Sequence, residues 1–184
     1  MSDEPRRHPD MWVDPEDDPR RQEFTAGERE TLLDYLDAYR QTLVMKCEGL
    51  TPEQLATASV PPSDLSLLGL VRHMAAVEQS WFRRVMGRDL TLSRLYGTQQ
   101  DRDAEFTGAE PSPECVDEAF GALAREVAYA EAYVASQEDL GVTGRHDDGE
   151  IELREVLVHM IEEYARHCGH ADLLRECIDG RTGQ

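Results

Sequence analysis

The sequence predicts an all-α protein, a four-helix bundle with one long crossover connection between its second and third long helices. Four segments repeat apolar residues at steps of three and four, the spacing of one face of a helix. Strand signals are weak, because β-branched runs are few and no tight turn separates two alternating segments. The length, 184 residues, suits one domain with a substantial core.

The first long helix is expected to begin at Thr25, which forms a capping box with Glu28 in the sequence. Its apolar pattern lasts until Gly49, a typical stop signal. Residues 1–24 hold four prolines among charged residues and cannot build a core, so we expect an extended or disordered arm. Trp12 is the one large apolar anchor by which this arm can dock on the body. Residues 25–184 then form a single helical domain.

A short helix is expected next, capped by Thr51 and with Pro52 at its first position. The second long helix should run from about Leu65 to Met86 and stop at Gly87. Its apolar face of leucine, methionine and valine also contains an ionisable residue, His73.

Residues 88–112 form a long connection with little periodicity, of the kind that often serves as a lid or a binding loop. The third long helix should start at Ser112 and end near Leu140, with an apolar face that carries no chemistry. Residues 141–149, rich in glycine and aspartate, are expected to form a turn into the last helix, residues 150–180.

The charge of the chain excludes some partners. There are 38 acidic and 19 basic residues, a formal charge of −19, which argues against a nucleic-acid backbone or an anionic membrane. No apolar run reaches the roughly 20 residues that span a bilayer, and the first residues lack the apolar core of a secretory signal. We therefore expect a cytoplasmic protein. Its four cysteines form no CxxC pair and are expected to be free and mostly buried.

The last helix carries the strongest functional signal. Its buried face should consist of Leu153, Val156, Met160, Glu163, His167, His170, Leu174 and Cys177. A carboxylate and two imidazoles in the middle of an apolar face are costly unless they are paired or bound. Glu163 and His167 are four residues apart, so they lie on one face and can hold a divalent ion.

Simpler interpretations exist for each residue. A Glu–His pair at this spacing is often only a contact on a helix surface, and a lone histidine such as His73 is often a satisfied core residue. A shared metal, bound by His73, Glu163 and His167, explains all of them at once and leaves positions open on a zinc or iron ion. His170 can be a further ligand, a residue that orients a ligand, or a general base, and His159 flanks Glu163 on the other side.

Two motifs resemble a known family. LVRHMAAVEQSWFRR around His73 and HMIEEYARHCGHADLLRE around Glu163 and His167 resemble the ligand helices of the DinB-like superfamily. The closest branch is that of the uncharacterised mini-circle-type proteins, and the pattern is also similar to the mycothiol-dependent maleylpyruvate isomerases. The resemblance covers residues 25–180 and implies the same three ligands. His170 stands where many members have glutamine, and we expect no counterpart of the isomerases' extra C-terminal domain within these 184 residues.

The resemblance implies a metal-dependent transferase or isomerase that uses a small-molecule thiol of the mycothiol type. Zinc is the expected ion, with nickel or iron as alternatives, and the partners are a small-molecule substrate and a low-molecular-weight thiol. Two other functions stay open: a metal-assisted hydrolase with His170 as its catalytic base, and a non-catalytic stress-response or binding protein with a structural metal. The resemblance also implies a homodimer. Apolar residues beside the buried face of the last helix fit either a dimer interface or a wide core (Leu157, Ile161, Tyr164 and Cys168).

Overall fold

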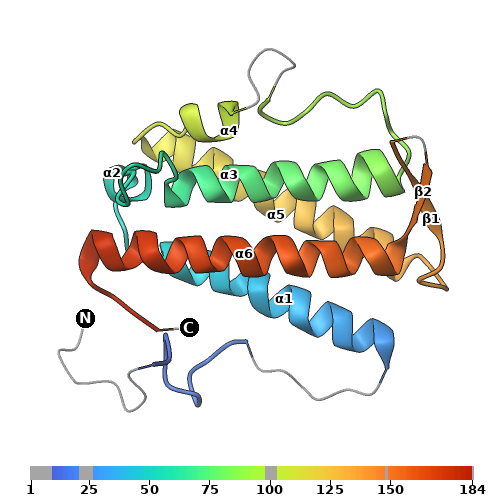
Figure 1. Cartoon of the computed structure of the whole chain (residues 1–184), viewed down its shortest axis with the longest axis horizontal. Helices are drawn as coiled ribbons and strands as arrows, with labels where there is room; N and C mark the ends of the chain where they lie inside the picture. The colour runs from blue at the N-terminus through green and yellow to red at the C-terminus, as the bar shows by residue number, and fades with distance from the viewer. Residues whose placement is uncertain (1–9, 21–26, 98–102, 148, 184) are drawn as a thin grey trace.

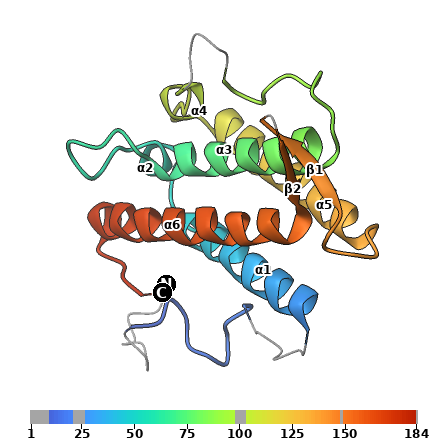
Figure 2. The ribbon, with the colours of Figure 1, turned by 45° about the vertical axis from the view of Figure 1, so that its right-hand side comes forward.

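The computed structural model describes residues 10–20, 27–97, 103–147 and 149–183, and it shows a helical bundle (Figures 1 and 2). The second long helix changes from α-helical to π-helical geometry at Gln79, and this wider segment is labelled η1. The long elements are α1 (Glu28–Cys47), α3 (Leu67–Glu78) with η1 (Gln79–Met86), α5 (Pro113–Ala135) and α6 (Leu153–Asp179). The short helices are α2 (Pro52–Leu55) and α4 (Ala104–Thr107).

The contacts between the long helices fit the predicted crossover connection. Helix α1 packs against α6, α3 packs against α5, and α3 also contacts α6. Figure 1 shows that α3 and α5 run in the same direction, so the connection between them has to return along the bundle. The predicted four-helix bundle with its crossover is therefore confirmed. Helix α4 lies within the connection and packs on α3, although no helix was predicted there.

The predicted starts of two helices, at Thr51 and Ser112, are confirmed. Thr51 caps α2 as predicted, in a capping box with Gln54, and the Ser112 hydroxyl accepts the Cys115 backbone N–H at the start of α5. Gly180 ends α6 in the left-handed conformation, at a φ of 75°, which glycine adopts without steric cost. The predicted cap Thr25 lies outside the described residues, and Gly27 is the residue before the first turn of α1.

The prediction of a simple turn before the last helix is wrong. Helix α5 ends at Ala135, and a two-stranded antiparallel hairpin follows, β1 (Thr143–His146) and β2 (Gly149–Glu152), with Gly144 opposite Ile151. The first strand packs closely on η1: a Cβ on Gly144 would lie 2.7 Å from the backbone carbonyl oxygen of Val85, so only glycine lets β1 approach the end of η1 this closely. The sequences TGRH and GEIE contain few β-branched residues, so propensity did not reveal these strands.

A buried polar network joins three of the long helices. Arg40 of α1 donates two hydrogen bonds, of 2.7 and 2.9 Å, to the carboxylate of Glu78 at the end of α3. The Tyr164 hydroxyl of α6 donates a third, of 2.9 Å, to the same carboxylate. Glu78 and Tyr164 are fully buried. Burial raises the pKa of Tyr164 well above its ordinary value, so its hydroxyl is a permanent donor.

The described part of the N-terminal arm is seated on the body. Trp12 is 1% exposed, and its ring lies under the cationic groups of Lys46, Arg175 and Arg181. The predicted docking of Trp12 is thus confirmed. These contacts attach residues 10–20 to the ends of α1 and α6.

The apolar residues beside the buried face of α6 belong to a wide core. Leu157, Tyr164 and Cys168 are buried within the chain itself, so they give no support to a dimer interface, and the homodimer stays a prediction. All four cysteines are free; Cys177, which was expected to be buried, is exposed. None of the described helices is both long and apolar enough to cross a membrane.

Candidate metal centre

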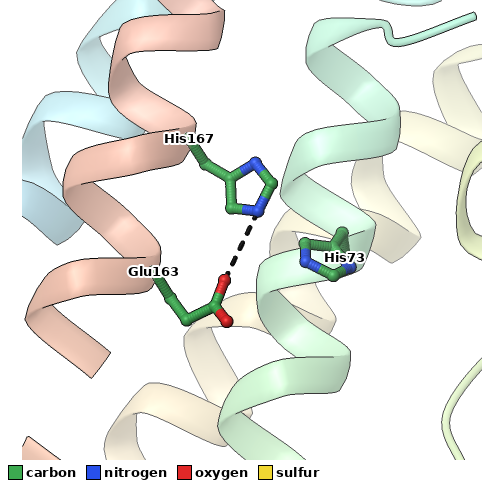
Figure 3. Close-up of side chains that lie close together, drawn as sticks. All are labelled: His73, Glu163 and His167. Atoms are coloured by element: carbon green, nitrogen blue, oxygen red, sulfur yellow. Dashed lines mark ion pairs between the residues drawn. The ribbon is translucent and has the colours of Figure 1, made fainter. Parts of the chain in front are cut away.

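The three predicted ligands come together between α3 and α6 (Figure 3). Their ligand atoms all lie within 4.8 Å of one another. Glu163 Oε2 is 3.5 Å from His167 Nε2, and the ring centres of His73 and His167 are 4.7 Å apart. Two atoms bound to one tetrahedral zinc ion at about 2.0–2.1 Å are about 3.3–3.5 Å apart. Glu163 and His167 already have this spacing. The ligand atom of His73, within 4.8 Å of theirs, would have to move closer by about 1 Å to share the ion.

The centre is sheltered but accessible. The side chains of His73, Glu163 and His167 are 21%, 26% and 12% exposed. Burial, and then the nearby His73 and His170, lower the pKa of His167 to about 4. His167 is therefore neutral at pH 7, the form in which an imidazole binds a metal. Two neutral imidazoles and one carboxylate are a donor set that suits a divalent zinc or iron ion with open positions.

An unpredicted residue, Glu105, orients His73. Oε1 of Glu105 in α4 is 2.8 Å from Nδ1 of His73. A carboxylate only accepts hydrogen bonds, so Nδ1 carries the proton and Nε2 keeps its lone pair for a ligand. Histidines that bind metals commonly donate their other N–H to a carboxylate in this way. The His–Glu contact is thus the arrangement that a metal ligand needs.

Helix α4 is held where Glu105 can reach His73. Arg72 donates to the backbone carbonyls of Glu105 and Ala104, at 2.9 and 3.3 Å. The Phe106 ring stacks on His73, with ring centres 5.4 Å apart. A Cβ on Gly69 would lie 2.8 Å from that phenylalanine ring, so the glycine allows α4 to pack closely on α3. Glu105 sits in a connection without periodicity, and for this reason no sequence signal singled it out.

The two further histidines of α6 lie on either side of the centre. Nδ1 of His170 is 3.2 Å from Nδ1 of His167, on the nitrogen that does not face Glu163. Nε2 of His159 is 3.3 Å from the second carboxylate oxygen of Glu163, Oε1. Among the described residues, no other group of three or more His, Cys, Asp or Glu side chains is arranged to share an ion.

Comparison with known proteins identifies the family. The family model described as mycothiol-S-transferase matches residues 31–180 of the sequence. The chain belongs to the mycothiol-S-transferase family. This is a DinB-like family, so the resemblance seen in the two motifs is confirmed. No curated protein matches the sequence. A conserved protein of Enterococcus faecalis has a similar structure, with a TM-score of 0.58 and 16% identity over 85% of this chain and 99% of that chain, and it shares the fold.

The four cysteines of the chain are the internal candidates for a reactive sulfur. Burial raises the pKa of the Cys47 and Cys168 thiols to about 12, so both are inert as nucleophiles at neutral pH. Cys115 bonds weakly to Gly108 on the connection, and Cys177 is on the surface at the end of α6. None of the four is in the group formed by the two histidines and Glu163.

Proposed function

We propose that the protein is a metal-dependent S-transferase that joins mycothiol, or a similar low-molecular-weight thiol, to a small electrophile. His73, Glu163 and His167 would hold the divalent ion, with zinc favoured over nickel or iron because zinc readily accepts three protein ligands and one exchangeable ligand. The observation that carries the proposal is the convergence of these three side chains in a member of the mycothiol-S-transferase family. A thiol partner of this type also supports a cytoplasmic location, where thiols stay reduced.

A divalent ion at this centre would lower the pKa of a coordinated thiol and so supply a thiolate at neutral pH. The charge of the ligand side chains determines the net charge of the centre to which the thiolate would bind. Glu163 contributes one negative charge, and His167 is neutral at pH 7 because of its lowered pKa. The centre with a divalent ion then has a net charge of +1, which a thiolate neutralises.

The neighbouring residues keep the two histidine ligands in the correct tautomer. Glu105 accepts the Nδ1 proton of His73. Nδ1 of His170 lies 3.2 Å from Nδ1 of His167. With its own proton on Nε2, His170 would accept the Nδ1 proton of His167 and leave Nε2 of His167 for the ion. This geometry supports a positioning role for His170 rather than that of a base acting on bound water, so the hydrolase remains the weaker alternative.

The experiment measures whether turnover needs a thiol. Zinc-loaded protein is incubated with an aryl chloride, 4-chloro-3-nitrobenzoate, in the presence or absence of mycothiol. We expect thioether and chloride only when mycothiol is present, and neither from the Glu163→Ala variant, which should lose the ion. Phenol formed without thiol would identify a hydrolase. No product in either case, with the ion bound, would contradict both activities.

A further inference from the structure

A small pocket opens beside the candidate metal centre. It has a volume of about 220 Å³, and His73 and Glu105 are among the residues that line it. Trp81 and Arg84 of η1 and Arg94 of the connection also line it. Pockets for drug-sized ligands are typically about 300–1,000 Å³, so this one suits a smaller molecule.

The wide helical segment η1 supplies much of this lining. Gln79, Ser80, Trp81 and Arg84 all line the pocket and all belong to η1, which continues directly from the helix of His73. Segments of π-helix are rare and are frequently found at functional sites. The pocket is therefore built on the same helix as a predicted metal ligand.

The charge of the pocket is opposite to that of the whole protein. The chain has a net charge of −19, yet two arginines and one carboxylate line this pocket. The carboxylate, Glu105, is already engaged with His73. Arg84 donates one hydrogen bond to the Leu92 carbonyl and also lies near Asp89. With an ion bound next to it, the pocket is a positively charged site on an acidic protein.

Arg94 is the arginine that is available to a ligand. Its side chain is exposed, and within the described part of the chain it has no hydrogen-bond or ion-pair partner. A guanidinium has five donors in a planar fork that matches a carboxylate. Trp81 adds an apolar surface: its ring stacks on His146 at 5.0 Å and contacts His159 at 4.6 Å, so two neighbours fix its position.

Building on the S-transferase function proposed above, we propose that this pocket binds the electrophile and selects small substrates that carry a carboxylate. Arg94 binds the anion, Trp81 covers the carbon skeleton, and the reacting carbon faces the thiol at the centre. With an aryl chloride, the thiolate forms a carbon–sulfur bond, the carbon–chlorine bond breaks, and chloride leaves with the electron pair. The thiol proton goes to the solvent, so no further reactant is needed.

Binding tests the pocket without depending on turnover. Calorimetry of the zinc-loaded protein compares 3-nitrobenzoate with 3-nitrobenzamide, which have the same shape but differ in charge. We expect the acid to bind about tenfold more tightly, the worth of one charge-assisted hydrogen bond. Arg94→Gln should abolish the preference and Arg94→Lys should keep part of it. Arg154→Gln removes an equal charge from an exposed residue that does not line the pocket, and it should have no effect.

One alternative is that the carboxylate binds the ion and not the arginines. If Arg94→Gln retains the full preference while removal of zinc abolishes it, the inference is overturned. Equal binding of acid and amide by the parent protein overturns it as well. If the acid is preferred through Arg94 but no thioether forms from 4-chloro-3-nitrobenzoate and mycothiol, the pocket stands and the S-transferase function fails.

Discussion

Nδ1 of His73 lies 2.8 Å from Oε1 of Glu105, so the connection between α3 and α5 orients one ligand of the candidate metal centre. Glu105→Gln keeps the shape but weakens this contact and no longer enforces the tautomer. We expect zinc affinity to fall about 10- to 100-fold, the usual cost of losing such a partner. Competition with a chromophoric chelator measures the affinity. Glu110→Gln, an exposed change in the same connection, is the matched control, and equal affinities for the two variants would contradict this role.

Removal of the metal should destabilise the fold. An ion that binds the folded chain but not the unfolded chain stabilises the fold by about 2.7 kcal/mol at a concentration 100 times its dissociation constant. A domain of this size loses about 2–4 °C in Tm for each kcal/mol, so we expect Tm to fall by roughly 5–10 °C in protein verified to be metal-free. Calorimetry measures the change, and zinc should restore the original Tm. An unchanged Tm would mean that the ion makes no contribution to folding.

The metal-free protein should also become less stable as the pH falls from 6.5 to about 4. The pKa of His167 is lowered from 6.5 to about 4 in the folded state, mainly by burial, so in this range the unfolded chain binds one more proton than the folded chain. Stability is therefore complete above pH 6.5 and declines toward pH 4, by up to about 3 kcal/mol. Urea unfolding at several pH values measures this slope.

The control for this pH dependence is His167→Gln, which removes the titrating group and keeps the size of the side chain. The difference in slope between the parent and the variant isolates His167 from the carboxylates that also titrate near pH 4. Parallel slopes would show that His167 is not shielded in the folded protein.

The network of Arg40, Glu78 and Tyr164 should contribute to stability. Tyr164→Phe removes a donor to a carboxylate that is fully buried, so the free energy of unfolding should fall by about 1.5–3 kcal/mol. Tyr35→Phe removes the same atom from an exposed ring and should change it by less than about 0.5 kcal/mol. Urea unfolding of both variants gives the comparison, and equal effects would mean that the Tyr164 hydrogen bond is not stabilising.

The sequence predicted what is periodic and missed what depends on tertiary contacts. Helical spacing located the four long helices and placed Glu163, His167 and His73 on apolar faces, which was enough to predict that they meet. Glu105 was missed because its role depends on where the connection folds back. The partners Arg40 and Glu78 were missed because they are far apart in sequence. The hairpin was missed because its strand residues have little strand propensity, and the close packing of Gly144 on η1 is a tertiary contact that no local pattern shows.

The most direct test of the proposed function is the absorbance of cobalt-substituted protein as a small thiol is added. We expect a thiolate-to-cobalt charge-transfer band in the parent protein. Glu163→His should keep a ligand but add one unit of positive charge, so the band should appear at lower pH, and Glu163→Ala should lose the metal. Cys168→Ser should change little, because that buried thiol has a pKa of about 12. If no small thiol produces the band in cobalt-loaded parent protein at any pH at which it is folded, the thiol-transfer function is contradicted.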